Sequence, residues 1–264
     1  MPSNDPYWPG KFTLFDGLLF TGRPDLTQSG MPRVRVITEQ NYFPPGTPKE
    51  ARALGADPAY VRDTTIGTRP GAPFYVQDIE EWSLKHYKCD VPTVLSNIVK
   101  HRTVLSAHRA AEPHVPHAIY VCPPREYFGS IGKESNSDSY QKWISALDML
   151  WPLLKAVDIF TPSMYMFYDD QAAAVTYLTE SIAVYRKYSE PLNKPIIPLI
   201  WPQFHPSHPT NPLGLISGAY WRLILDTLFP LVDSLIIWGG YGIDWDDQAE
   251  WWLETEQFKT THGL

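Results

Sequence analysis

Short apolar runs alternate with longer helical patterns along almost the whole chain of 264 residues. Seven runs have the length and composition of strands and are predicted at residues 12–20, 33–38, 74–79, 117–122, 158–166, 195–200 and 234–238. Helices are predicted at residues 91–111, 137–155, 171–189, 213–229 and 246–258, with Ser137 as an N-cap. Strands that alternate with helices indicate a parallel sheet built from right-handed βαβ units.

Two α/β architectures have this element order: an open, doubly wound sheet and a closed barrel. The sequence contains neither of the Gly-rich motifs, G-x-G-x-x-G or G-x-x-x-x-G-K-[ST], that a nucleotide-binding doubly wound sheet carries. Polar and aromatic residues instead follow many predicted strands, at the end where a barrel builds its active site. We therefore predict a TIM-type (β/α) barrel, distorted and with seven or eight strands. It is expected to form a single catalytic domain over residues 1–264.

Charge and cysteine content argue against several classes of protein. The net charge is −7 and the pI is near 5.6, whereas a nucleic-acid-binding protein is expected to be basic. The two cysteines, Cys89 and Cys122, make no disulfide framework and are expected to be free thiols. No apolar run approaches the ~20 residues of a membrane span, so no membrane partner is expected. Residues 1–6 lack the features of a signal peptide, which predicts a cytoplasmic protein or one secreted after processing.

A pair of acidic residues ends the third predicted strand. Asp78 and Glu80 are two residues apart, so an extended backbone would place them on one face, with Cα atoms roughly 6.6 Å apart, and would point Glu81 to the opposite face. Like charges at that distance raise each other's pKa, and burial adds to the effect. One carboxyl group can then remain protonated as a general acid while the other is ionised. The pair is therefore predicted to be catalytic.

Aromatic residues are abundant, with 10 Trp and 15 Tyr. Most of them are expected to pack in the core, but those at strand ends suit a carbohydrate, whose C–H faces stack on rings and whose hydroxyls accept and donate hydrogen bonds. The predicted substrate-binding residues follow the second, fifth, sixth and seventh strands and are Glu39, Tyr165, Tyr168, Trp201, Gln203 and Trp238.

Three segments are similar to those of a known enzyme family. They are VQDIEEW at residues 76–82, PSMY at 162–165 and LIIWG at 235–239. In sequence and order they resemble the D-x-E, Pro-Ser-x-Tyr and final Trp-ending strand segments of the hyaluronidases, glycoside hydrolase family 56, and more distantly the chitinase-type barrels of family 18. The chain is shorter than the animal hyaluronidases, lacks their cysteine pairs and has no evident Arg or Lys cluster beside the D-x-E motif.

This resemblance implies a retaining glycosidase whose nucleophile is the substrate's own 2-acetamido group. Glu80 would be the general acid and then the general base, and Asp78 would orient and stabilise the acetamido group. The resemblance further implies that Tyr165 hydrogen-bonds the acetamido carbonyl and that Trp238 lines the floor of the sugar subsite.

Other interpretations remain open. On a glycan without acetamido groups, Glu39 is a candidate second carboxylate of an inverting hydrolase that uses Asp78 and Glu80. A polysaccharide lyase and a non-catalytic glycan-binding barrel are the further alternatives. The partner in each case is a poly- or oligosaccharide.

No cofactor or metal is expected. The eight histidines are assigned mostly to loops, and the segment His205-Pro206-Ser207-His208-Pro209 is interpreted as a rigid loop whose His205 contacts substrate, not as a metal site. No Cys/His cluster has zinc-site spacing.

Overall fold

The computed structural model describes residues 11–65, 72–85, 88–124 and 137–264, and the N-terminal segment considered above lies outside them. Two compact units divide the chain. Unit 1 comprises residues 11–33, 163–191 and 195–264, and unit 2 comprises residues 34–162 and 192–194, apart from the residues not described.

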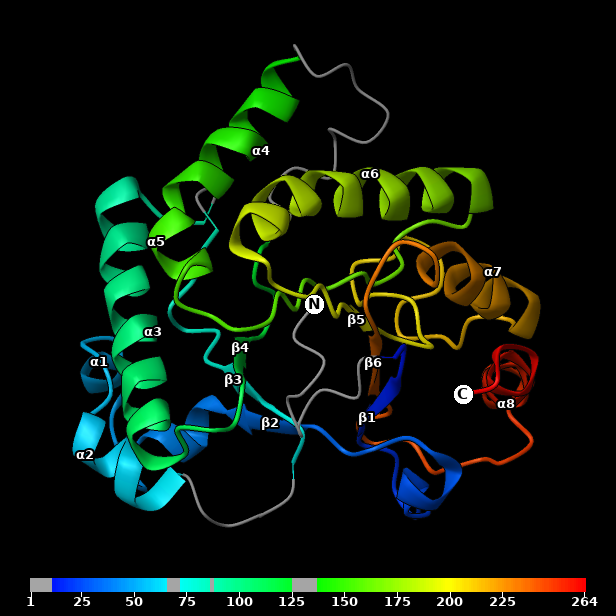
Figure 1. Cartoon of the computed structure of the whole chain (residues 1–264), viewed down its shortest axis with the longest axis horizontal. Coiled ribbons are helices and arrows are strands. Elements are labelled where there is room, and N and C mark those ends of the chain that lie inside the picture. Colours follow the sequence, from blue (N-terminus) through cyan, green and yellow to red (C-terminus); the bar gives the residue numbers. More distant parts are fainter. Residues whose placement is uncertain (1–10, 66–71, 86–87, 125–136) are drawn as a thin grey trace. The chain divides into compact units, whose positions relative to one another are not determined.

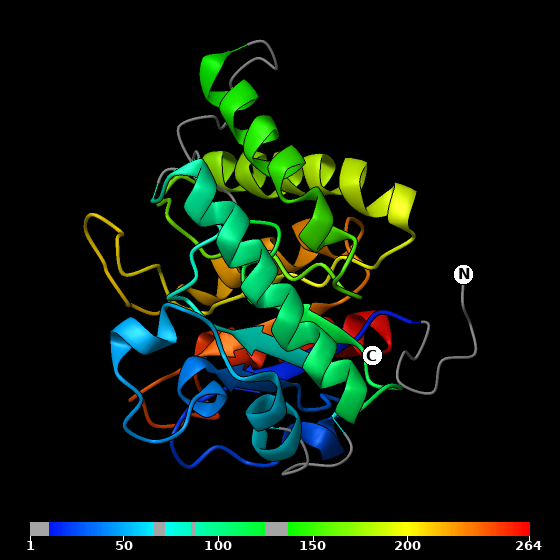
Figure 2. The same ribbon diagram turned by 90° about the vertical axis from the view of Figure 1, so that its left-hand side faces the viewer.

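Unit 2 contains a parallel three-stranded sheet in the order β2 (Arg35–Thr38), β3 (Tyr75–Asp78) and β4 (His117–Ile119). Thr38 pairs with Asp78, so β2 and β3 end at the same level. Helix α3 (Val91–Ala111) covers one face of this sheet, and Figure 2 shows it passing in front of the strands. The contact is partly polar, because the buried ring of His101 on α3 bonds to Gln77 on β3.

The remaining helices of unit 2 are short or amphipathic. Helix α4 begins after Ser137, whose side chain accepts from the backbone N–H of Tyr140 at 3.4 Å, so the predicted N-cap is confirmed. The elements are η2 (Glu39–Tyr42), α1 (Lys49–Arg52), α2 (Pro58–Tyr60), η3 (Val61–Thr65), α4 (Asp138–Met149) and α5 (Trp151–Leu154).

Unit 1 contains a second parallel sheet in the order β1 (Leu14–Leu18), β6 (Leu235–Gly239) and β5 (Leu199–Ile200). Its helices are η1 (Leu26–Ser29), α6 (Gln171–Ser189), α7 (Gly218–Leu228) and α8 (Glu250–His262). Helices α7 and α8 lie side by side in Figure 1 and are joined by a buried hydrogen bond from Trp221 Nε1 to Thr255 Oγ1, 2.9 Å long. The turn η5 (Glu190–Leu192) begins in unit 1 and ends at the first residue of the 192–194 segment of unit 2.

Several predicted strands are longer than those observed. In the run at 117–122 the strand ends at Ile119, although the backbone N–H of Tyr120 still donates to the carbonyl oxygen of Gln77, and Val121 turns the chain with a positive φ of 56°. The run at 195–200 is a strand only at its last two residues, because Pro195 and Pro198 have no N–H to donate. The run at 158–166 forms no continuous strand; single bridges occur at Thr161, Ser163 and Met166.

The helix predictions are more accurate than the strand predictions. Helices α3 and α6 have the predicted bounds, and an aspartate caps each N-terminus, Asp90 and Asp170 respectively. The pattern at 213–229 becomes helical only from Gly218, and the pattern at 246–258 only from Glu250. Neither Cys89 nor Cys122 takes part in a disulfide bond, as expected.

The α/β class is confirmed in its coarse form: parallel strands alternate with helices, and each unit contributes a sheet of three strands. A closed seven- or eight-stranded barrel and a single domain stay predictions. Within the described part of the chain, no helix combines the length and apolar character needed to cross a membrane.

One lysine holds the end of α5 in unit 2. Lys194 Nζ donates to the carbonyl oxygens of Leu154 at 2.9 Å, Lys155 at 2.7 Å and Val157. The carbonyl group of Leu154 is one that the helix end leaves without an intrahelical partner, and those of Lys155 and Val157 lie just beyond the helix.

We predict that Lys194→Met lowers the free energy of unfolding by about 2–3 kcal/mol, because charged hydrogen bonds to partly buried carbonyls are lost. Urea unfolding of the variant and of the exposed-site control Lys142→Met measures this. Equal effects of the two substitutions would contradict the proposed role of Lys194.

Candidate functional site

Asp78 is the last residue of β3 and its carboxyl group is largely withdrawn from water. Among the described residues its Oδ1 atom is buried and accepts no hydrogen bond. Burial, followed by the charges of Glu80 and Glu39, raises the pKa of Asp78 to about 7. The carboxyl group therefore exchanges its proton near neutral pH, the range in which acid–base catalysis is most effective.

Glu80 lies in a turn and not on the strand. Because β3 ends at Asp78, the predicted alternation of side chains does not extend to Glu80 and Glu81. Glu80 is exposed, and it is nevertheless close enough for its charge to raise the pKa of Asp78. The structure thus brings the two predicted catalytic carboxyl groups into electrostatic contact. This contact raises the proton affinity of Asp78.

Glu39 follows β2 and reaches the same turn. Its Oε1 lies 3.4 Å from Arg52 Nη1, and its Oε2 accepts from the backbone N–H of Glu81 at 3.4 Å. Glu81 in turn lies 3.0 Å from Arg52 Nη2. A single guanidinium group therefore joins two carboxylates that flank the Asp78–Glu80 pair.

The turn is also held from the side of α3. The ring of His101 accepts from Gln77 Nε2 at 2.6 Å and donates through Nε2 to the carbonyl oxygen of Trp82 at 2.9 Å. Burial lowers the pKa of His101 to about 4, which keeps the ring neutral in this arrangement. The indole of Trp82 is itself buried and packs edge-on against His101.

The assignment of the histidines mostly to loops is wrong for His262, which lies on α8, and for three buried histidines. His101 and His108 lie buried on α3, and His117 lies buried on β4. The rings of His108 and His117 are 5.1 Å apart, and burial lowers their pKa values to about 3 and 4. They are neutral core residues.

Unit 1 carries the predicted aromatic residues. Tyr165 is almost fully buried and packs edge-on against Trp201, with ring centroids 5.3 Å apart. Trp201 Nε1 donates to Gln203 Oε1 at 2.5 Å, and Gln203 Nε2 donates to the carbonyl oxygen of Leu213 at 2.7 Å. Gln203 is buried, so its amide orients Trp201; a contact with substrate stays a prediction.

Two glycines at the end of β6 allow the rings of Trp201 and Phe20 to pack against the backbone. Trp238 is part-exposed and is followed by Gly239 and Gly240, which both have positive φ. A Cβ atom on Gly239 would lie 1.9 Å from Trp201 Nε1, and one on Gly240 would lie 2.0 Å from Phe20. Only glycine allows the aromatic rings to approach the backbone this closely.

The other predicted residues of unit 1 lie in the same group of loops. Tyr168 is part-exposed, and its carbonyl oxygen accepts from Tyr220 Oη at 2.7 Å. His205 is part-exposed and packs against Phe167, with centroids 4.4 Å apart. His208 is buried, and its Nδ1 accepts from the backbone of Asn211 at 3.1 Å. The predicted rigid loop is thus held by its own histidine, and among the described residues no group of three or more His, Cys, Asp or Glu side chains could hold a metal ion.

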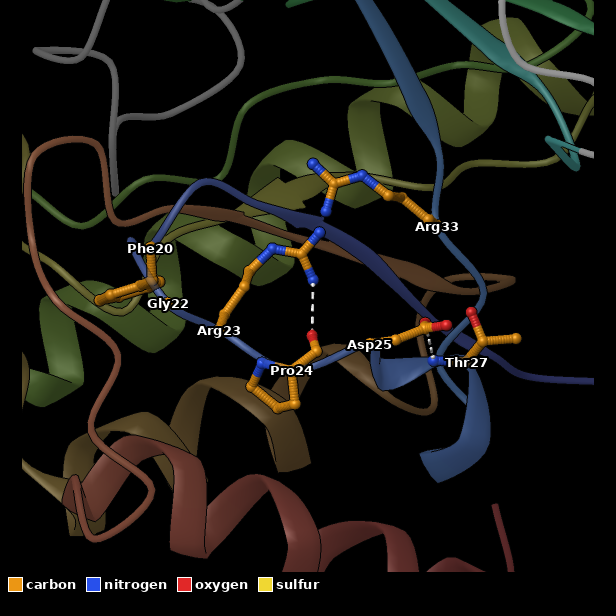
Figure 3. A pocket seen from close by; sticks show the side chains of 7 residues that line it. All are labelled: Phe20, Gly22, Arg23, Pro24, Asp25, Thr27 and Arg33. Carbon is orange, nitrogen blue, oxygen red and sulfur yellow. Dashed lines mark hydrogen bonds between the residues drawn. The ribbon is translucent and has the colours of Figure 1, made fainter.

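Unit 1 also contains a pocket of about 520 Å³ lined by two arginines (Figure 3). Arg23 and Arg33 both bind Oδ2 of the buried Asp16, at 2.7 and 3.1 Å. Asp25 lines the same pocket and interacts electrostatically with Arg23. Asp25 is the acidic residue of this lining, and both of its arginines are already paired with Asp16.

Sequence reasoning missed Arg52 and His101. His101 lies seven residues before His108 on a predicted helix, a spacing that places both on one face, and this signal could have identified them as buried. No local pattern distinguishes Arg52, because its partners come from two other segments.

The fold is similar to those of known glycoside hydrolases. The chain and bee venom hyaluronidase superpose with a TM-score of 0.63 at 12% identity, over 96% of this chain and 97% of that chain. For bee venom hyaluronidase in complex with a hyaluronic acid tetramer the TM-score is 0.51 at 14% identity, over 72% of this chain and 66% of that chain. For the endo-1,4-β-D-mannanase of Thermotoga petrophila the TM-score is 0.54 at 13% identity, over 94% of this chain and 89% of that chain.

At these identities the similarity shows the fold alone. No protein-family model matches the chain, and no curated protein matches its sequence. The chain therefore has a fold like that of these glycoside hydrolases, while membership of the hyaluronidase family stays a prediction.

We predict that Asp78→Asn stabilises the protein at pH 8. The folded-state pKa of Asp78 lies above its unfolded value, so ionisation destabilises the folded protein as the pH rises through 7. The amide removes this effect, and we expect a gain of about 2 kcal/mol in the free energy of unfolding at pH 8 that disappears near pH 4.

Asp63→Asn serves as the control for urea unfolding at both pH values, because Arg62 lowers the pKa of Asp63 and its replacement brings no gain at pH 8. A gain for Asp78→Asn that does not depend on pH would show that its carboxyl group is not destabilised by ionisation.

We predict that Gly239→Ala lowers the free energy of unfolding by more than about 2 kcal/mol, because the new methyl group combines a positive φ with a clash against Trp201. Gly242→Ala is the matched control, since Gly242 also has a positive φ but has open space around its Cβ position. Thermal unfolding that ranks the two variants equally would contradict close packing of Trp201 on Gly239.

Proposed function

We propose that the protein is a glycoside hydrolase that cleaves glycans containing 2-acetamido sugars with retention of configuration. The observation that carries this proposal is the buried carboxyl group of Asp78, with a pKa of about 7, beside Glu80 at the end of β3. The likeness of the fold to bee venom hyaluronidase and to an endo-mannanase supports a glycosidase.

In the first step, the carbonyl oxygen of the substrate's acetamido group attacks the anomeric carbon. The bond to the leaving sugar breaks, and Glu80 donates its proton to the departing oxygen. The acetamido group acquires positive charge and closes a five-membered ring. Asp78, as a carboxylate beside its N–H, stabilises this charge.

In the second step, Glu80 removes a proton from water as the water oxygen attacks the anomeric carbon. The ring opens, the acetamido group is restored, and the product keeps the original configuration. The protein needs no second nucleophile, which agrees with both carboxyl groups lying on one segment, residues 78–80.

The raised pKa of Asp78 suits this cycle. Below pH 7 Asp78 retains a proton in the free protein, and in the proposed cycle this proton passes to Glu80 when substrate binds, which leaves Asp78 as the carboxylate and makes Glu80 the acid for the leaving group. When positive charge develops on the acetamido group, the ionised form of Asp78 becomes favourable, and its stabilisation is greater in the transition state than in the free enzyme. The burial that destabilises the charge in the resting protein thus strengthens its interaction with the substrate.

Glu39 is less suited to be the base of an inverting hydrolase. Both of its carboxylate oxygens are engaged within unit 2, one by Arg52 and one by the backbone N–H of Glu81. For the aromatic residues we propose sugar binding by the part-exposed rings of Trp201, Trp238 and Tyr168. Tyr165 is proposed to donate a hydrogen bond from its hydroxyl group to the acetamido carbonyl of the substrate.

We predict that Glu80→Gln abolishes release of reducing ends from glycans with 2-acetamido sugars, with a loss of at least about 100-fold, while folding and glycan binding are retained. Asp78→Asn is expected to lose most activity on the same glycans. The measurement is a panel of glycans with and without acetamido groups, assayed with the wild type, both variants and the exposed-site control Glu190→Gln.

Release from glycans without acetamido groups would contradict the substrate-assisted route and direct the search for a second carboxylate to Glu39. Activity of Glu80→Gln above about a tenth of the wild type would exclude Glu80 as the acid. Binding without turnover by the wild type would identify a glycan-binding protein, and an unsaturated product would identify a lyase.

A further inference from the structure

Arg52 is a cation that pairs with two glutamates of unit 2, Glu39 and Glu81. It is the last residue of α1, and its guanidinium group contacts Glu39 after β2 and Glu81 in the turn after β3. The side chains of Arg52 and Glu81 are only 25% and 14% exposed, so solvent screens this ion pair less than it screens a surface pair.

The backbone of Arg52 makes a second contact with the same turn. Its carbonyl oxygen accepts from the indole Nε1 of Trp82 at 2.9 Å. Arg52 therefore holds two consecutive residues of the turn, Glu81 by its side chain and Trp82 by its main chain. Glu80, the residue immediately before them, is exposed.

We propose that Arg52 is a positioning residue for catalysis: by joining Glu39 to Glu81, it holds the turn that presents Glu80 beside Asp78. This inference rests on the proposed function, since it assigns to Glu80 the role of the acid. Arg52 does not itself contact the reacting atoms in this assignment.

The geometry explains why an arginine stands here. The planar guanidinium group presents separate N–H groups, Nη1 to one carboxylate and Nη2 to the other, whereas a lysine ammonium is a single point charge. Without the cation, Glu39 and Glu81 would repel each other, and the bond from the Glu81 N–H to Glu39 Oε2 would be weakened. The turn would then lose its connection to the end of β2.

The charge of Arg52 has a second effect. Among the described residues, Asp78 interacts electrostatically with Glu80 on its own segment and with Glu39 and Tyr42 on η2. Arg52 pairs with Glu39 and so offsets one of the charges that disfavour ionisation of Asp78. Its removal is expected to raise the pKa of Asp78 further.

The test compares Arg52→Met, Arg52→Lys and the control Arg62→Met, which removes an arginine from an exposed ion pair with Asp63. For Arg52→Met we expect kcat on the acetamido glycan to fall about 10- to 100-fold with KM within about threefold, because misplacement of a catalytic group affects the chemical step. Carboxyl ¹³C NMR titration of the free protein should show the pKa of Asp78 raised by about half a unit. Arg52→Lys should restore that pKa but not kcat, and Arg62→Met should change neither.

The outcomes separate the two proposals. If Glu80→Gln is inactive but Arg52→Met keeps kcat within twofold of the wild type, the role of Arg52 is refuted and the proposed function stands. If the wild type cleaves no glycan of the panel, the proposed function fails, and an unchanged Asp78 titration in Arg52→Met would refute the electrostatic effect independently. If Arg52→Met does not fold, Glu81→Gln removes the ion pair between Arg52 and Glu81 instead. An unchanged kcat in that variant would equally overturn the inference.

Discussion

The proposed chemistry depends on a carboxyl group that is kept out of water at the end of a parallel strand. Asp78 follows three buried residues of β3, and its Oδ1 is buried without a hydrogen-bond partner among the described residues. Ionisation there is opposed by lost solvation and by two neighbouring glutamates, so the proton is held up to neutral pH. An arrangement that destabilises the folded protein is typical of sites that are retained for function.

The segment after Asp78 has no regular structure, and its conformation depends on partners from three directions. Arg52 holds Glu81 and Trp82 from α1, His101 binds the carbonyl oxygen of Trp82 from α3, and Glu39 accepts from the backbone N–H of Glu81. A catalytic group needs such support, because a small misplacement of the reacting atoms greatly reduces the rate. The turn is therefore as much a part of the proposed site as the two carboxyl groups.

In unit 1, glycine decides where the aromatic rings can lie. Gly239 and Gly240 let Trp201 and Phe20 rest on the backbone just after Trp238, and Gln203 binds both Trp201 and the N–H of Gly240. Several of the predicted sugar-binding residues thus form one group, joined by a hydrogen bond and by edge-on ring packing. Their order in the sequence indicated strand ends, but not that Gln203 would be buried among them.

The sequence alone determined what depends on local interactions. The bounds of α3 and α6 follow from their periodicity and their aspartate caps, and the D-x-E motif predicted Asp78 and Glu80 as the candidate pair at the end of a strand. Only the tertiary structure decided the lengths of the strands, which depend on pairing with distant segments, and the raised pKa of Asp78, which depends on burial. It also brought Arg52 to Glu81, because an ion pair between side chains of separate segments leaves no periodic signal in the sequence.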